Sequence, residues 1–411
     1  MGTTTRSNAN VGVRVYLDHA ATTPLDKEIL SLMLPYWGES YGNPSSLHES
    51  GRRAARAIAE ARERIARRLN ANADEILFTG SGTESDNLAI IGVARAYMSA
   101  GRHLIISAIE HKAVLEAAHA LEREGFEVSV VPVDTYGMLD IPAVVSLVRD
   151  DTTLISLMLA NNEIGTILPV SELSRALEKR RRDTGFPRIH TDACQAAGHL
   201  PLDVTALGVD LMTLNGSKVY GPKGVGVLYK RRETKIAPLI VGGGQESGLR
   251  AGTESVPLIM GMAFALEKAE MLRKKEEPRL RVLRDYFLSG LRSRIPGIIV
   301  NGHPSEVLPH IVHITVPGIE GESMVLMLDE AGVEIATGSA CSASDLRPSH
   351  VLVAIGQDND LIHGGIRFSL GRSTTQGALD HVLSVFPPIV EKLQAASALT
   401  THRYAKEKHT V

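Results

Sequence analysis

The sequence predicts an α/β fold, with a large domain built on a mainly parallel sheet flanked by helices and a smaller α+β domain at the C-terminal end. Amphipathic stretches of helix length alternate with short runs of β-branched residues, which is typical of helices packed on a parallel sheet. After Pro278 the order changes to helix, short strand, strand and helix, which indicates a second domain. The chain has 411 residues, of which 44% are apolar, and this is enough for more than one core.

The domain boundaries follow these changes of pattern. The first dozen residues are polar and show no periodicity, so we predict a flexible tail over residues 1–14. Residues 15–262 are assigned to the large domain, although the stretch 15–30 could pack with the small domain. The remainder, 263–411, is assigned to the small domain.

Three helices are predicted from their apolar spacing or from their end signals. Over residues 51–70, apolar side chains recur at three- and four-residue spacing and form one stripe. A second helix follows a Gly-Ser-Gly turn and runs from about Glu84 to Tyr97. A third extends from Val256 to Glu277 and is closed by Pro278. We expect the charge runs 179–182 and 273–277 to end helices, because cations are favourable at helix C-termini.

The strands are predicted from short apolar and β-branched runs between these helices. They are expected over residues 75–79, 103–107, 128–133, 153–159, 188–192, 210–214 and 225–230.

Composition excludes several classes of protein. The formal charge is −3 with both signs spread along the chain, so there is no electrostatic reason to expect nucleic acid or an anionic membrane surface as a partner. No run of eighteen apolar residues predicts a transmembrane helix, and the N-terminus lacks a signal-peptide stretch. Two cysteines are too few for disulfides to stabilise a chain of this length, which indicates a reducing compartment. We therefore predict a cytoplasmic protein.

Lys218 lies just beyond a predicted strand, between small and glycine residues. The carboxyl edge of an α/β sheet is where such folds bind ligands. Exposed loop lysines are common, so a Schiff-base role needs a phosphate cradle, a carboxylate for a pyridinium nitrogen and a group that stacks on a ring. Candidates for all three follow other predicted strands.

The turn before the helix at residue 84 offers the amides of Gly82 and the amide and hydroxyl of Thr83 to an anion, although such turns are common. Asp192 ends an apolar strand, where it either caps the next helix or pairs with a buried cation. His111 ends another strand and either stacks on a flat ring or is structural. The shared location of these residues at strand ends favours a single site.

Long ordered segments of the chain resemble the NifS/IscS-type cysteine desulfurases, which belong to the class V aminotransferase group. They include YLDHAATTP (16–24), FTGSGTESDNLAI (78–90), NNEIG (161–165), TDACQ (191–195), GGGQESGLRAGTES (242–255), ATGSACSAS (336–344) and IRFSLGR (366–372). The resemblance implies a fold-type I transferase that depends on pyridoxal 5'-phosphate.

The resemblance also implies roles for individual residues. Lys218 would bond covalently to the cofactor, Asp192 would pair with its pyridine nitrogen, and His111 would stack on its ring and help to move protons. Arg367, with Asn162, would bind the substrate carboxylate. The other cofactor-binding residues would be Gly82, Thr83, Asn162, Gln195, Asn215, Ser217 and, from a second subunit, Thr253. No metal site is expected.

At two positions the chain departs from the best-known members of the family. They have Ser-Gly-His-Lys where this chain has Asn215-Gly216-Ser217-Lys218. Asn215 and Ser217 can still form hydrogen bonds with a phosphate, but a possible positive charge is absent.

The resemblance gives the two cysteines different roles. Cys341 lies among small polar residues, which predicts a mobile, exposed loop, and by resemblance it would be the nucleophile that takes sulfur from the substrate. Cys194 is interpreted as a small buried residue without a catalytic role.

The resemblance implies a homodimer with shared sites that converts L-cysteine to L-alanine. The sulfur would pass from Cys341 to an acceptor, such as an IscU-type iron–sulfur scaffold or a tRNA-thiolation relay, with Cys341 able to bridge to an acceptor's iron–sulfur cluster. The alternatives are a selenocysteine lyase or a class V aminotransferase and, more distantly, a non-catalytic sulfur-relay subunit.

Overall fold

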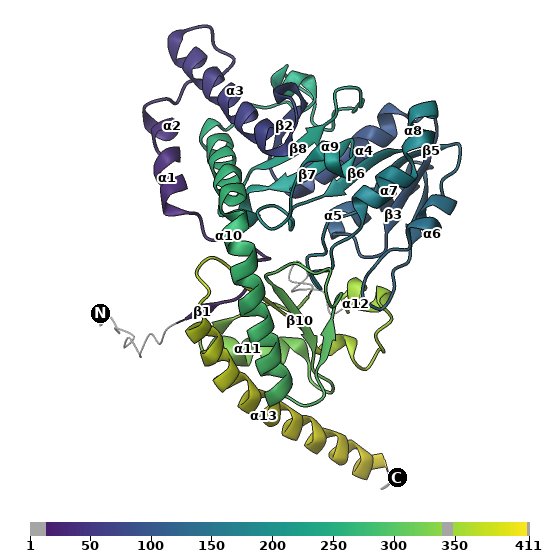
Figure 1. Cartoon of the computed structure of the whole chain (residues 1–411), viewed down its shortest axis with the longest axis vertical. Coiled ribbons are helices and arrows are strands. Elements are labelled where there is room, and N and C mark those ends of the chain that lie inside the picture. The colour runs from purple at the N-terminus through teal and green to yellow at the C-terminus, as the bar shows by residue number, and fades with distance from the viewer. Residues whose placement is uncertain (1–13, 339–347, 409–411) are drawn as a thin grey trace.

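The computed structural model describes residues 14–338 and 348–408, and its largest feature is a seven-stranded sheet (Figure 1). The strand order is β2-β8-β7-β6-β5-β3-β4. The strands are β2 (Ile76–Thr79), β3 (His103–Ser107), β4 (Glu127–Val131), β5 (Thr152–Ser156), β6 (Arg188–Asp192), β7 (Leu211–Asn215) and β8 (Gly226–Lys230). β8 is antiparallel to both neighbours, and all the other pairs are parallel. The predicted mainly parallel sheet is confirmed.

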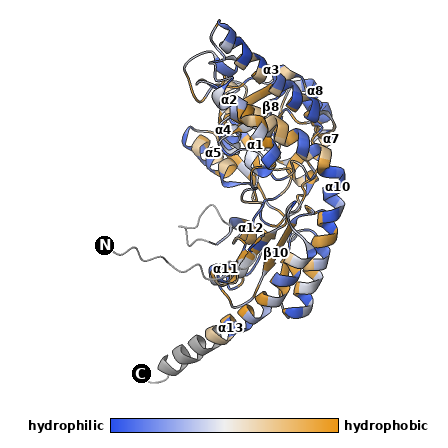
Figure 2. Cartoon of the chain, turned by 90° about the vertical axis from the view of Figure 1, so that its left-hand side faces the viewer, coloured by the Kyte–Doolittle hydropathy of each residue, from blue (hydrophilic) through white to orange (hydrophobic). Residues whose placement is uncertain are grey.

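Helices cover both faces of this sheet. Residues that alternate along a strand therefore pack into two different apolar clusters. Ile76 packs in the cluster that includes α3, α7 and α10, whereas Leu77 packs in the cluster of α4 and α5. The helices of this part are α1 (Lys27–Met33), α2 (Pro35–Gly38), α3 (Glu49–Leu69), α4 (Gly82–Ala96), α5 (Lys112–Arg123), α6 (Ile141–Ser146), α7 (Val170–Ala176), α8 (Glu178–Thr184) and α9 (Val204–Leu207). Strands such as β8 are mostly hydrophobic in Figure 2, and the helices alternate between hydrophilic and hydrophobic residues.

The helix predicted over residues 51–70 is confirmed as α3. Its stripe of Ala54, Ile58, Ala61, Ile65 and Leu69 is buried. The helix begins after His48, whose ring nitrogen accepts a hydrogen bond from Gly51 N, and ends at Asn70 in the left-handed conformation with φ of 55°.

The prediction that Pro278 closes a helix is wrong. α10 (Val256–Arg294) continues through Pro278 for four more turns. The proline removes one main-chain hydrogen bond, but the following turns bury Leu280, Phe287 and Leu291 in a second apolar cluster. Burial of these large side chains outweighs the local cost of the proline. For the same reason the charge run 273–277 lies inside α10 and does not end it. The run 179–182 fills the middle of α8, with Arg181 and Arg182 in its last turn.

The second cluster belongs to a three-stranded antiparallel sheet of order β12-β10-β9. These strands are β9 (Ile299–Asn301), β10 (Ile311–Thr315) and β12 (Gly365–Ser369), and they are accompanied by α11 (Gly321–Glu330) and α13 (Gln376–Lys408). α12 (His350–Ala354) precedes β12 in the chain, but its buried residues pack in the first cluster. α10 passes from the first cluster to the second between Ala269 and Leu280. The division of the chain at residue 262 stays a prediction.

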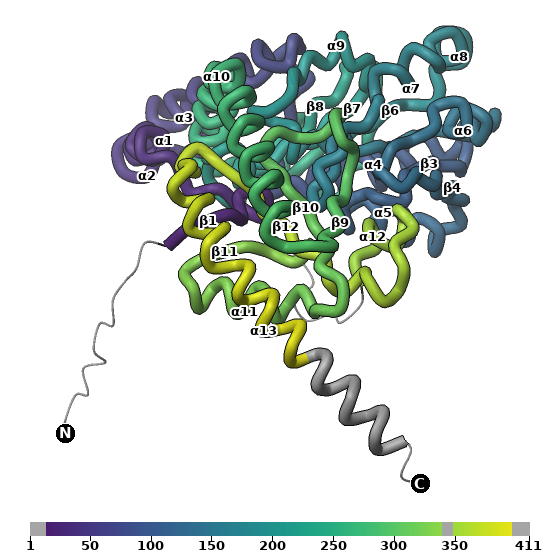
Figure 3. Tube along the Cα trace, turned by 60° about the horizontal axis from the view of Figure 1, so that its bottom comes forward, coloured from purple at the N-terminus to yellow at the C-terminus, as the bar shows by residue number. Residues whose placement is uncertain are grey.

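The first described residues of the chain join this second cluster. β1 (Val15–Tyr16) pairs in parallel with β11 (Val333–Glu334), and Figure 3 shows the two strands beside each other. Val15 and Leu17 are buried there. Within the described ranges, no helix has the length and hydropathy that crossing a bilayer requires.

Candidate active site

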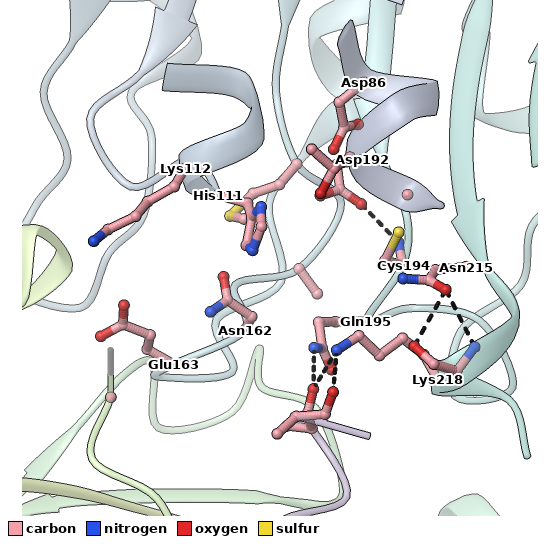
Figure 4. Close-up of a pocket in the computed structure, with 18 of the residues that line it drawn as sticks. Asp86, His111, Lys112, Asn162, Glu163, Asp192, Cys194, Gln195, Asn215 and Lys218 are labelled. Carbon is pink, nitrogen blue, oxygen red and sulfur yellow. Dashed lines mark hydrogen bonds between the residues drawn. The ribbon is translucent and has the colours of Figure 1, made fainter. Parts of the chain in front are cut away.

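A cavity of about 350 Å³ lies where the carboxyl ends of the parallel strands meet (Figure 4). The loops that follow β2, β3, β5, β6 and β7 all contribute to it, which is the ligand-binding edge of an open α/β sheet. Ten of the predicted site residues line it, namely Gly82, Thr83, His111, Asn162, Asp192, Gln195, Asn215, Ser217, Lys218 and Arg367. The structure therefore brings together side chains that are far apart in the sequence.

Two predicted residues are not among those that line the cavity. Thr253 is exposed in the segment before α10. Cys341 lies outside the described residues, between Gly338 and Pro348. Their roles stay predictions.

The start of α4 forms one end of the cavity. The side chain of Ser81 accepts a hydrogen bond from Glu84 N, and the N–H groups of the first helical residues, Gly82 and Thr83, have no partner within the helix. A Cβ atom on Gly82 would lie 3.0 Å from Cys194 Sγ and 3.3 Å from Asn215 Nδ2, so a side chain would fill this space. The start of α4 is consequently a tight cradle for an anion.

Asn215 and Ser217 lie opposite this cradle, at the end of β7. Asn215 Oδ1 accepts hydrogen bonds from Ser217 N and Ser217 Oγ, each at 3.2 Å. This arrangement begins the short 3₁₀ helix Gly216–Lys218. The Asn215 amide nitrogen stays directed at the space beside Gly82, where it can donate to a phosphate.

Lys218 reaches the cavity from the end of this short helix. Its Nζ donates hydrogen bonds to Ala20 O at 2.8 Å and to Ala21 O at 2.6 Å. The same loop is held to the N-terminal segment by Thr23, whose N and Oγ1 both donate to Ser217 O. The amine is therefore held at the cavity by the segment that follows β1 (Figure 4).

Asp192 supplies a buried carboxylate on the far wall of the cavity. Its Oδ1 accepts a hydrogen bond from Cys194 N at 2.9 Å. Burial and the neighbouring Asp192 raise the pKa of Asp86 well above its usual range, which favours the neutral form of Asp86. Burial lowers the pKa of the adjacent His190 to about 4. With these two neighbours neutral, Asp192 is the group that can face a cation such as a protonated pyridine nitrogen.

Arg367 enters the cavity from β12 of the second sheet. The residue is 2% exposed, its Nη1 donates to Asn162 O at 2.8 Å, and its Nη2 pairs with Asp18 Oδ1 at 2.8 Å. Nε is buried and has no partner among the described residues. A guanidinium whose position is fixed by two such contacts, and which has further N–H donors, suits a carboxylate ligand.

Two further predicted residues complete the walls. His111 caps α5, since its Nδ1 accepts a hydrogen bond from Ala113 N at 3.2 Å. Gln195 Nε2 donates to Ala20 O at 2.9 Å. In Figure 4, His111 and Gln195 lie on different sides of the cavity.

Five ionisable side chains that were assigned no role from the sequence also line the cavity, namely Asp86, Lys112, Glu163, Cys194 and His350. Asp86 lies four residues after Gly82 and therefore on the same face of α4. This spacing could have predicted from the sequence that Asp86 faces the cavity. Glu163 adjoins Asn162. Nothing local marks His350, because it reaches the cavity through the packing of α12 against the first apolar cluster. Burial raises the pKa of the Cys194 thiol, which disfavours a thiolate.

Glu110, beside His111, gives a prediction of pH dependence. It is fully buried, and burial raises its pKa from 4.5 to about 8. Between these values the folded protein binds more protons than the unfolded chain, so the free energy of unfolding falls as the pH rises. Wild-type unfolding by denaturant should show the free energy of unfolding falling on the order of 4 kcal/mol from pH 5 to 9, and we expect Glu110→Gln to remove this fall. An unchanged pH slope in this variant would contradict the assignment.

The donor set can hold a phosphorylated pyridine aldehyde. The cradle at Gly82 could accept the phosphate, Asp192 could pair with a ring nitrogen, and Lys218 could supply an amine. Arg367 adds a carboxylate site for an amino acid. The residues present therefore fit pyridoxal phosphate.

Comparisons with known proteins agree with this arrangement. The family model described as "Aminotransferase class-V" matches residues 15–382. "Cysteine desulfurase IscS" of Dictyoglomus turgidum is 51% identical over 383 residues, which cover 93% of this chain and 96% of that protein. A protein of the same description from Methanosarcina thermophila is 48% identical over 390 residues, which cover 95% of each chain. A solved structure described as "NIFS-LIKE PROTEIN" has a TM-score of 0.86 and 37% identity, and the match covers 93% of this chain and all of that one.

Proposed function

Because the chain belongs to the class-V aminotransferase family and is a cysteine desulfurase of the NifS/IscS type, we propose that its cavity binds L-cysteine and that Cys341 receives the sulfur. The observation that carries this proposal is the convergence of Lys218, Asp192 and Arg367 on one cavity. L-Cysteine and the Cys341 thiol would give L-alanine and a persulfide on Cys341, and the atoms of this exchange balance.

The cofactor proposed for this cavity is pyridoxal 5'-phosphate. When bound, it withdraws electrons from the α-carbon of an amino acid joined to it. The amides of Gly82 and Thr83, with Asn215 and Ser217, hold the phosphate. Asp192 would pair with the ring nitrogen and His111 would cover the ring, since both residues line the cavity. Gln195 and Asn162 are proposed to bond its phenolic oxygen.

The remaining steps fall to the residues of the chain. Arg367 orients L-cysteine through its carboxylate, helped by Asn162. Lys218 Nζ takes the proton from the α-carbon and later returns a proton to the product. Ala20 O and Ala21 O stabilise the ammonium that Lys218 forms in between, since both carbonyls already accept hydrogen bonds from it.

Cys341 performs the sulfur transfer. Its thiolate attacks the sulfur of the bound cysteine, a new S–S bond forms, and the C–S bond of the substrate breaks. The persulfide then passes its outer sulfur to an acceptor protein, for which we propose an iron–sulfur scaffold of the IscU type or a tRNA-thiolation relay. This chemistry needs reduced thiols, and we accordingly propose a cytoplasmic location.

A homodimer is part of the proposal. Thr253 is exposed and does not line the cavity of its own chain, which is consistent with a phosphate contact made to a second copy. Large apolar side chains are exposed nearby in sequence, including Ile240 and Val241. Such residues favour burial between subunits.

The test of the function is a turnover assay. Purified protein with pyridoxal phosphate, L-cysteine and a thiol reductant should release sulfide and L-alanine in equal amounts. An aminotransferase on the same fold would need pyruvate or 2-oxoglutarate, and a non-catalytic relay would release neither product. Turnover that depends on an added oxo acid would therefore refute the proposal.

Arg367→Ala should weaken the use of L-cysteine strongly. The substitution removes the only guanidinium among the residues that line the cavity in the described part of the chain. We expect KM for L-cysteine to rise about 100-fold, as for the loss of one partner in a buried charge pair. Steady-state kinetics measure this, and cysteamine, which has no carboxylate, is the matched probe. An equal loss with both compounds would show that Arg367 acts elsewhere.

A further inference from the structure

Glu163 is a buried carboxylate in the cavity wall that the proposed reaction does not use. The residue is 3% exposed. Its main-chain N–H donates to Asn161 Oδ1 at 2.8 Å, so its backbone is fixed independently of its side chain. Burying a carboxylate is costly unless hydrogen bonds compensate it, which raises the question of what this one binds.

Its main side-chain partner is Ser349, at the start of α12. Ser349 Oγ donates to Glu163 Oε2 at 2.5 Å and accepts a hydrogen bond from Leu352 N, so the same hydroxyl also caps the helix. His350 Nε2 lies 2.8 Å from Glu110 O and holds the same end of α12 to the loop after β3. The start of α12 is thus fixed against the cavity from two sides.

Gly338 approaches the same oxygen atom from the other direction. A Cβ atom at Gly338 would overlap Glu163 Oε2 and would lie 3.1 Å from His313 Nε2. Only a glycine brings its main chain this close to the carboxylate. Gly338 and Ser349 are also close to the two points where the described chain stops and resumes around Cys341.

We propose that Glu163 is a positioning residue for sulfur transfer, because its carboxylate packs closely against Gly338 and accepts a hydrogen bond from Ser349, and so fixes at the cavity wall two residues between which Cys341 falls in the sequence. The inference rests on the proposed role of Cys341 as nucleophile. A reacting group must be held to a fraction of an ångström, and residues that touch neither substrate nor cofactor commonly do this.

The experiment compares Glu163→Ala with Glu163→Gln in the holoenzyme. Three quantities are measured: persulfide formation on Cys341 by protein mass, the L-cysteine concentration that half-saturates the absorbance change of the cofactor, and the rate at which iodoacetamide alkylates Cys341 without substrate. We expect Glu163→Ala to slow persulfide formation about 10- to 100-fold. The half-saturating concentration should change less than about twofold, and the alkylation rate should change at least about threefold.

The conservative variant and a matched control make the result specific. Glu163→Gln keeps an oxygen that can accept from Ser349 and should stay within about threefold of the wild type in all three measurements. Glu172→Ala makes the same chemical change at an exposed glutamate of α7 and should alter none of them. Because Glu163 and Ser349 share one hydrogen bond, Glu163→Ala/Ser349→Ala should be no slower than the slower single variant.

Unchanged persulfide formation and unchanged alkylation in Glu163→Ala would overturn the inference. So would a Glu163→Gln variant as impaired as Glu163→Ala, because charge and not the hydrogen bond would then matter. If the wild type forms no persulfide on Cys341, the proposed function fails instead. The alkylation rates still decide the role of Glu163 in that case, because they need no turnover.

Discussion

Cys341→Ala should abolish the release of sulfide and L-alanine from L-cysteine, with a loss of at least about a thousandfold. The thiolate is the proposed acceptor of the substrate sulfur, and removal of a covalent nucleophile typically costs this much or more. Binding of the cofactor should persist, because the cradle at Gly82 and the carboxylate of Asp192 are unaltered. Sulfide assay, amino-acid analysis and the absorbance of the bound cofactor measure the three quantities.

Cys194→Ala is the matched control, since the sequence contains two cysteines. Cys194 is buried, and burial raises the pKa of its thiol, so it is poorly suited to nucleophilic attack. This variant should keep sulfide release within about fivefold of the wild type. A Cys341→Ala variant that turns over as fast as the wild type would show that the nucleophile is another group.

Lys218→Ala should prevent covalent attachment of the cofactor and slow turnover by about 10²- to 10⁴-fold. The variant removes the amine that is proposed both to bond the cofactor and to move the α-carbon proton, and loss of a general base alone has an effect of this size. Borohydride reduction followed by peptide mass analysis reports the attachment, and the turnover assay reports the rate.

Lys223→Ala provides the control for this variant. Lys223 lies in the same loop and its Nζ donates to Thr23 O at 2.7 Å, but it does not line the cavity. Its peptide should show no cofactor mass, and Lys218 should still carry the cofactor in this variant. A covalent adduct that survives in Lys218→Ala would mean that another lysine holds the cofactor.

Local sequence patterns predicted the central sheet well because most of its strands are buried on both faces, the edge strand β4 being the exception. The predicted strands 103–107 and 188–192 coincide with β3 and β6, whose side chains are nearly all buried. The strand predicted over 153–159 ends earlier, at Ser156, although Leu157 N and Leu159 N still donate to β6. The apolar run alone does not mark where a strand leaves the sheet.

Tertiary packing decided the points where sequence patterns failed. The proline rule placed a helix end at Pro278, but the second core holds the helix beyond it. Likewise, the strand-end residues Lys218 and Asp192 could be predicted to share a site because parallel strands end at one edge. The contact of Glu163 with Gly338 and Ser349 could not, because it depends on how the second sheet packs against the first.

The N-terminal segment has a consequence for how the protein is made. Ala20 and Ala21 contact Lys218, Asp18 pairs with Arg367, and His19 Nδ1 lies 3.0 Å from Ser369 O, 350 residues along the chain. During synthesis this segment leaves the ribosome well before β12 and meets its partners there only after the 350 residues that separate His19 from Ser369 have followed. The active site therefore cannot be completed before β12 has been synthesised, because Asp18 and His19 have their partners on that strand.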